Sequence, residues 1–264
     1  MEPIKVVVHG AQGKVGQEVV KAVCRESGMR LVGAVEMEVS ADVLSLPDGS
    51  GTVPFSSRVE DILKQCPADV MVDFTIARAA LPAARTAMSH RVNLVIGTTG
   101  LSKDEIGEIE DLATTQGVGV VMAPNFALGA VLMMHLAAVA AKYLDYAEII
   151  ELHHNQKADA PSGTALTTAR NMAAARGKPF LAPQESPETA ESRGKQIDGI
   201  PIHSVRLPGL LAHQEVLLGA PGQTLSIRHD TINRECFMPG VLLAIREVVK
   251  RKGLTYGLDK LLEL

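Results

Sequence analysis

This chain of 264 residues has few aromatic residues and few cysteines, and its basic residues do not outnumber its acidic ones. Tryptophan is absent and aromatic residues make up 3%, so the core must be mainly aliphatic, which suits a buried parallel sheet covered by helices. The net charge of −4 argues against a nucleic-acid partner, which normally requires a basic surface. No segment has the roughly 18 unbroken apolar residues that a membrane helix needs. We therefore expect neither a nucleic acid nor a membrane as partner.

The three cysteines, Cys24, Cys66 and Cys236, form neither a Cys-x-x-Cys pair nor a disulfide framework. This spacing is typical of idle thiols in a reducing compartment. The first five residues lead directly into a strand-like run and leave no room for a signal peptide. We expect a cytoplasmic protein, although a protein of the plastid stroma would look the same after removal of its transit peptide.

The first half of the chain alternates strand-like and helix-like stretches. Strands are predicted at Ile4–His9, Leu31–Glu36, Val70–Phe74, Asn93–Ile96 and Val118–Met122, and helices at Lys14–Arg25, Ala77–Ser89 and Lys103–Thr115. This rhythm is typical of an α/β protein with a Rossmann-like, doubly wound parallel sheet.

After Pro124 the pattern changes to longer helices and to strands joined by short turns. Helices are predicted at Leu128–Lys142, Ser162–Arg176 and Met238–Lys250, strands at Glu148–His153, Ile202–Arg206, Gln214–Leu218 and Thr224–His229, and a surface loop at Lys178–Gly199. The turn Ala220–Gln223 should close a hairpin. We expect residues 1–126, completed by 235–264, to form a dinucleotide-binding domain, and residues 127–234 to form an α+β substrate-binding domain with a mixed sheet.

A glycine-rich loop, Gly10–Gly16, joins the first predicted strand to the first helix with the spacing G-x-x-G-x-x-G. Such glycines permit a tight turn, so that the helix N-terminus can present its N–H groups to a pyrophosphate. Glu36 closes the second strand, where a carboxylate can accept hydrogen bonds from a ribose. Met37 follows where a basic residue would hold a 2′-phosphate, which favours NAD, whereas Lys14 could supply that charge. The choice between NADH and NADPH stays open.

Two further loops follow strands of the same sheet. These are Gly97–Gly100 and Ala123–Phe126. Ligands of doubly wound sheets bind at the carboxyl ends of the strands, so we expect both loops to border the nicotinamide.

The segment Glu151–Ala165 carries the densest chemistry in the chain. His153 and His154 stand together at a strand end, Lys157 follows, and Ser162-Gly163-Thr164 opens a helix. Histidine and lysine can transfer protons near neutral pH, and a helix N-terminus can bind an anion. A metal site is the alternative for the two histidines, but no third ligand has a convincing spacing, so we expect none.

Several segments, taken in order, resemble the dihydrodipicolinate reductase family, also called 4-hydroxy-tetrahydrodipicolinate reductase. They are the glycine loop, Val72–Thr75, Gly97–Gly100, Ala123–Phe126 and the His-His-x-x-Lys segment, so that the resemblance covers nearly the whole chain. Ile202–Gly209, His213–Glu215 and Gly219–Gln223 are more similar to the cyanobacterial and plant branch than to the enterobacterial one.

The resemblance implies NAD(P)H-dependent reduction of 4-hydroxy-tetrahydrodipicolinate, a small dicarboxylate, to tetrahydrodipicolinate with loss of water, in lysine synthesis through diaminopimelate. His153 would be a proton donor and acceptor, Lys157 a proton donor, and His154 a substrate contact. Ser162, Gly163 and Thr164 would bind a carboxylate. The implied cofactor contacts are Gly10, Ala11, Gln12, Gly13, Lys14, Val15, Glu36, Gly97, Thr98, Thr99, Ala123, Pro124, Asn125 and Phe126. The resemblance also implies a homotetramer, assembled through the sheet of residues 127–234.

Two other functions stay open from the residues alone. Another Rossmann dehydrogenase of amino-acid precursors would explain the glycine loop but not His153–Thr164. A non-catalytic NAD-binding sensor would tolerate loss of the histidine and lysine chemistry. The intact His-His-x-x-Lys motif therefore argues against a sensor. Arg206 and His213 face either the active cleft or a subunit interface, and the sequence does not distinguish between these two locations.

Overall fold

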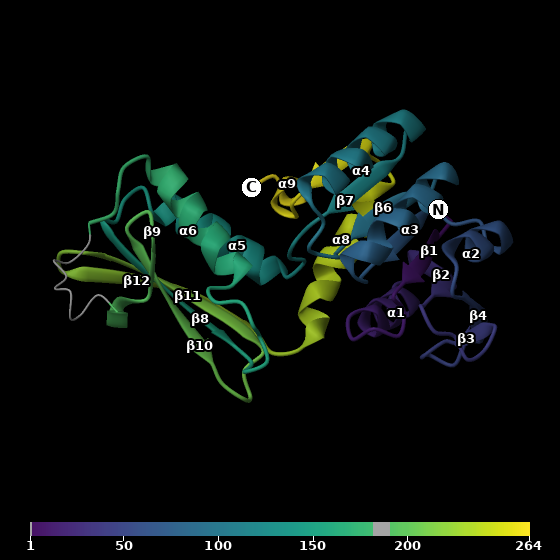
Figure 1. The fold of residues 1–264 in the computed structure, drawn as a ribbon, viewed down its shortest axis with the longest axis horizontal. Helices are drawn as coiled ribbons and strands as arrows, with labels where there is room; N and C mark the ends of the chain where they lie inside the picture. The colour runs from purple at the N-terminus through teal and green to yellow at the C-terminus, as the bar shows by residue number, and fades with distance from the viewer. Residues whose placement is uncertain (1, 182–190) are drawn as a thin grey trace. The chain divides into compact units, whose positions relative to one another are not determined.

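A computed structural model describes residues 2–181 and 191–264. The chain forms two compact units, each with a sheet of its own (Figure 1). Unit 1 comprises Met1–Leu128 and Arg234–Leu264, and unit 2 comprises Gly129–Asn233. Within the described residues, no helix combines the length and the apolarity that crossing a membrane would demand.

Unit 1 contains an eight-stranded sheet in the order β13-β7-β6-β5-β1-β2-β4-β3. Its strands are β1 (Ile4–His9), β2 (Met29–Val35), β3 (Val43–Ser45), β4 (Thr52–Ser56), β5 (Val70–Asp73), β6 (Asn93–Ile96), β7 (Gly119–Met122) and β13 (Gly253–Tyr256). All neighbours pair in parallel except β3 with β4, which pair antiparallel. The predicted Rossmann-like α/β sheet is therefore confirmed.

Helices pack against this sheet in two groups. They are α1 (Gly16–Arg25), α2 (Val59–Gln65), α3 (Ala77–Ser89), α4 (Lys103–Gln116), α8 (Met238–Val248) and the short α9 (Asp259–Leu262), with a 3₁₀ turn at Arg234–Phe237. Helix α3 contacts both α2 and α4, whereas α1 contacts α8. The core between them is aliphatic, with Val7, Met71 and Leu94 fully buried, as the lack of aromatic residues requires. Burying these side chains supplies the main driving force for this unit.

Unit 2 contains a mixed sheet in the order β12-β11-β8-β10-β9. Its strands are β8 (Tyr146–His153), β9 (Lys195–Ile197), β10 (Ile200–Arg206), β11 (Ala212–Ala220) and β12 (Gln223–Thr231). Strands β8 and β10 pair in parallel and the other neighbours antiparallel. Helices α5 (Leu128–Ala140) and α6 (Gly163–Arg176) lie along this sheet, and a 3₁₀ turn spans Glu191–Arg193. The predicted hairpin and mixed sheet are confirmed.

Several short elements were not predicted. These are β3, β4, α2, β13 and α9, which are three to seven residues long and so offer too few residues for a clear periodicity. The prediction of an unbroken surface loop at Lys178–Gly199 is wrong where β9 pairs with β10, and its residues 182–190 lie outside the described ones. The first helix begins at Gly16 instead of Lys14, because residues 10–15 form the glycine loop.

Candidate active site

The glycine loop of unit 1 has the geometry that a closely approaching ligand needs. Gly10 has a φ of +83°, which disfavours every residue with a side chain. A Cβ atom at Gly16 would lie 1.8 Å from the Gly10 carbonyl oxygen, so α1 begins in direct contact with the loop. The first N–H groups of α1 have no acceptor within the helix. The loop and helix end can therefore hold a phosphate.

Glu36 stands at the end of β2, next to this loop. Its Oε2 accepts a hydrogen bond from the Gln12 N–H at 2.9 Å, and its Oε1 accepts one from the Met37 N–H at 3.0 Å. Both bonds fix the carboxylate, which keeps further lone pairs for other donors. The structure thus brings Glu36 and the glycine loop together, as the sequence predicts.

A cavity of about 400 Å³ opens beside Glu36 within unit 1. Its lining includes Gly10, Gly13, Glu36, Met37, Thr75 and Arg78. Met37 is 72% exposed. Because its side chain is uncharged, the cavity has no cation at this position. Arg78, which the sequence analysis did not single out, contributes a positive charge to the same cavity. Glycine backbone, a carboxylate and an apolar wall suit the adenosine half of a dinucleotide.

The other two predicted loops follow β6 and β7, which are neighbours in this sheet. Thr98 is buried whereas Thr99 is exposed. Phe126 is buried and packs edge-to-face on Phe74, with ring centroids 5.6 Å apart. Asn125 accepts the Ala127 N–H at 2.9 Å and shapes the second loop. Both loops lie at the carboxyl ends of their strands, where doubly wound sheets bind ligands.

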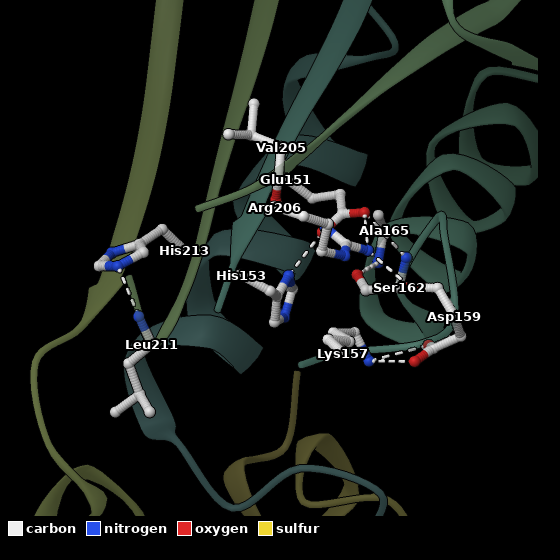
Figure 2. A network of polar contacts seen from close by, with 10 residues as sticks. All are labelled: Glu151, His153, Lys157, Asp159, Ser162, Ala165, Val205, Arg206, Leu211 and His213. Carbon is white, nitrogen blue, oxygen red and sulfur yellow. Dashed lines mark hydrogen bonds and ion pairs between the residues drawn. The ribbon is translucent and has the colours of Figure 1, made fainter. Parts of the chain in front are cut away.

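The centre of the polar network in unit 2 is Glu151, which is 0% exposed. The His153 ring donates through Nδ1 to Oε2 of this carboxylate at 2.5 Å (Figure 2). Arg206 donates to both carboxylate oxygens, at 2.9 and 2.7 Å. The Ser162 N–H adds a third donor at 3.2 Å. One buried carboxylate therefore joins β8, β10 and the start of α6.

The charge on Glu151 follows from these contacts. Burial by itself raises the pKa of Glu151, but the hydrogen bonds from His153 and Arg206 outweigh it and lower the pKa to about 2. The carboxylate is therefore ionised near neutral pH. An ionised acceptor at Nδ1 fixes the ring of His153 and leaves Nε2 outside this hydrogen bond.

The N-terminus of α6 lies in the same network. Ser162 caps this helix, its hydroxyl accepting the Ala165 N–H at 3.2 Å. The N–H groups of Gly163 and Thr164 are in the first turn, where a helix offers no internal acceptor. Together with the helix dipole, these N–H groups can bind an anion.

Lys157 lies in the loop between β8 and α6. Its ammonium donates to Asp159 at 2.6 and 2.8 Å, and the Asp159 carbonyl oxygen accepts from Arg206 at 2.6 Å. The loop is thereby tied to the Glu151 network, as Figure 2 shows. The His154 carbonyl accepts the Lys157 N–H at 3.1 Å. No hydrogen bond of the His154 ring is found among the described residues, so the predicted substrate contact of that ring stays a prediction.

Two residues whose role the sequence left open are now placed. Arg206 belongs to the Glu151 network, whereas His213 bonds Asp230 at 2.7 Å and accepts the Leu211 N–H at 3.3 Å. Glu151 itself was missed as a functional residue. A signal for it exists, because residues two apart in a strand point to the same face, which pairs Glu151 with His153.

Within residues 2–181 and 191–264 no cluster of three metal-ligating side chains occurs.

A dinucleotide-type loop in one unit, and in the other a histidine held by a buried carboxylate near a capped helix N-terminus, are typical of a nicotinamide-dependent reductase of a small anionic substrate. Family models agree with this class: "Dihydrodipicolinate reductase, N-terminus" matches residues 4–126 and "Dihydrodipicolinate reductase, C-terminus" matches residues 129–262. The chain belongs to the dihydrodipicolinate reductase family, whose members use a nicotinamide cofactor.

Curated relatives and solved structures agree. The chain is 59% identical over its whole length to the full 4-hydroxy-tetrahydrodipicolinate reductase of Dehalococcoides mccartyi. It is 49% identical to that of the cyanobacterium Synechocystis sp., covering 98% of each chain. A dihydrodipicolinate reductase from Paenisporosarcina sp. TG-14, solved with dipicolinate bound, has a TM-score of 0.86 and 41% identity, covering 98% of this chain and 99% of that one. The predicted family is therefore confirmed.

Proposed function

We propose that this chain reduces 4-hydroxy-tetrahydrodipicolinate to tetrahydrodipicolinate with NADH or NADPH and loss of water, in lysine synthesis through diaminopimelate. The observation that carries the proposal is the buried Glu151, which fixes the His153 ring next to the capped N-terminus of α6. A proton-transferring group and an anion site thereby share one network. The relative solved with dipicolinate bound supports a ring dicarboxylate as the ligand.

We assign cofactor binding to unit 1. The N–H groups of Gly10–Val15 and of α1 hold the pyrophosphate, Glu36 accepts hydrogen bonds from a ribose, and the loops Gly97–Thr99 and Ala123–Phe126 border the nicotinamide. The fit rests on the glycine geometry and on the cavity beside Glu36. When bound, the nicotinamide supplies the hydride.

We assign substrate binding and proton transfer to unit 2. Water leaves the hydroxylated ring to give a conjugated imine, hydride adds at ring carbon four, and the resulting carbanion takes a proton. His153, whose Nδ1 is held by Glu151, delivers that proton from Nε2, and Lys157 is a second donor. The α6 N-terminus at Ser162–Thr164 and the Lys157 ammonium balance the charge of the substrate carboxylates.

A coupled assay tests this function. Dihydrodipicolinate synthase generates the substrate in place, and the loss of reduced-nicotinamide absorbance reports its reduction. The expected result is oxidation of NADH or NADPH that depends on the synthase product. Cofactor binding without any such oxidation would contradict the proposal and favour a non-catalytic binding protein.

We infer a preference for NADH over NADPH. The Glu36 carboxylate is fixed by two backbone N–H groups in the cavity, where it accepts from a 2′-hydroxyl but repels a 2′-phosphate. Arg78 and Lys14 soften this preference without removing it. We expect kcat/KM to be about tenfold higher with NADH, which corresponds to about 1.4 kcal/mol.

A charge introduced at position 37 should shift this preference. Met37→Arg places a guanidinium beside the ribose and should improve kcat/KM for NADPH by about tenfold. Met37→Leu is the matched control and should leave the ratio unchanged, because Met37 is largely exposed. Steady-state kinetics with both cofactors measure the ratio. A wild-type enzyme that favours NADPH, or an arginine variant with an unchanged ratio, would refute the inference.

We also propose that unit 2 assembles the chain into a homotetramer. One face of its sheet is covered by α5 and α6, burying Ile149 and Val216, whereas Ile150 and Leu217 on the opposite face stay partly exposed. A second copy could cover these apolar residues. Light scattering on the purified protein should give four times the monomer mass, and Ile150→Asp should lower that mass. A monomeric wild-type protein would exclude the assembly.

The cytoplasmic location stays a prediction. Its support is that none of Cys24, Cys66 and Cys236 forms a disulfide within the described residues, as is usual in a reducing compartment.

A further inference from the structure

A buried carboxylate in unit 1 has no part in the reaction described so far. Asp73 ends β5 and is 2% exposed. It accepts a hydrogen bond from His9 Nδ1 at 2.5 Å, from the Thr75 N–H at 3.2 Å and from the Thr75 hydroxyl at 3.0 Å. The Thr98 hydroxyl donates to the same carboxylate. Four donors thus converge on one acidic side chain.

These donors come from three segments that are separate in the sequence. His9 ends β1 and precedes the glycine loop, Thr75 follows β5, and Thr98 follows β6. The three strands are neighbours in the sheet, and the loops are joined again where the Thr75 N–H donates to the Thr98 hydroxyl at 2.7 Å. Asp73 is therefore a common anchor for the loops at the carboxyl ends of these three strands.

The anchored side chains reach the cavity that the cofactor is proposed to occupy. His9 and Thr75 both line it, together with Gly10. Stability gives little reason for a buried carboxylate at this place, because a well-packed apolar side chain generally serves a fold as well as a buried ion pair. A carboxylate also orients its neighbours, because each hydrogen-bond donor must point toward the acceptor oxygen.

We propose that Asp73 is a positioning residue for the dinucleotide. It holds the His9 ring, Thr75 and Thr98 so that the loops after β1, β5 and β6 keep the shape that receives the dinucleotide. The inference deepens the proposed function, because it rests on the same cofactor site. It predicts that loss of the Asp73 network weakens cofactor binding, with much less effect on the proton transfer carried out in unit 2.

The test is a direct titration of NADH, followed by nicotinamide fluorescence without substrate. Asp73→Asn keeps the shape but replaces one acceptor oxygen by an NH₂ group, so we expect the Kd to rise by about tenfold or more. Asp69→Asn is the matched control. Asp69 accepts the Lys5 N–H at 2.7 Å at the opposite end of the same strands, so the Kd should stay within about twofold.

Kinetics separate positioning from general damage. In Asp73→Asn the KM for NADH should rise in parallel with the Kd, while kcat at saturating NADH stays within about threefold of the wild-type value. A wild-type Kd in a folded Asp73→Asn protein would overturn the proposal. A fall of kcat by about tenfold with an unchanged KM for NADH would also overturn it. Because the titration needs no substrate, it stands even if the proposed reductase activity fails.

Two milder variants cover the case in which Asp73→Asn does not fold. His9→Phe keeps a ring against the cavity but removes the donor to Asp73, and Thr98→Val removes a hydroxyl without loss of volume. Each should weaken NADH binding by about three- to tenfold. Wild-type binding in both would overturn the proposal independently of Asp73→Asn.

Discussion

His153→Ala is expected to lower kcat by at least about a hundredfold, the usual scale for a positioned acid. The reason is geometric: Glu151 holds Nδ1 of this ring at 2.5 Å, and Nε2 is the atom that we propose transfers the proton. Lys157→Ala should have an effect of the same size, because we propose that its ammonium is both a second proton donor and a counter-charge for the substrate. The coupled assay at saturating NADH measures both variants.

The control for this experiment is another partly exposed histidine that pairs with an acid. His90 contacts Glu60 at 3.1 Å in unit 1, and we expect His90→Gln to keep the wild-type kcat. Cofactor titration should give a wild-type Kd for His153→Ala, since the residue belongs to unit 2. Wild-type turnover in both His153→Ala and Lys157→Ala would mean that other residues carry the proton.

The parts of the site that could be predicted are those that local sequence determines. The glycine loop fixes its own turn and the start of α1, so its spacing is enough to predict a phosphate site there. Glu36 follows from its distance along a βαβ unit. His153 and Ser162 stand out because a strand end and a helix start are both readable from the chain.

The parts that were missed or left open depend on strand pairing between distant segments. Arg206 reaches Glu151 only because β10 pairs in parallel with β8, across 55 residues of sequence. Asp73 reaches His9 across 64 residues, because β5 lies next to β1. Residue types and short spacings do not determine such a register. The short strands β3, β4 and β13 were missed for a different reason, since each adds a few residues at an edge of the sheet.

Glu151→Ala is expected to have the largest effect on stability. It leaves the Arg206 guanidinium, which is mostly buried, without its carboxylate, and removing one partner of such a pair typically costs about 3–5 kcal/mol. Amide hydrogen exchange in β8 and β10 measures the free energy of opening in unit 2 alone. The double variant Glu151→Ala/Arg206→Met should recover much of the loss, because no unpaired charge remains. Equal losses in the single and double variants would show that the pair is not the cause.

The same residue gives stability a defined dependence on pH. The folded-state pKa of Glu151 is about 2, below its ordinary value of 4.5. The folded state therefore favours the ionised form, so this contribution is fully present above about pH 4.5 and is lost as the pH falls toward 2. A difference of about 2.5 units corresponds to about 3 kcal/mol. Exchange protection of β8 should fall over this interval in the wild-type protein, and less steeply in Glu151→Gln, which has no proton to take up. Parallel acid profiles for the two proteins would mean that Glu151 does not carry the charge that orients His153.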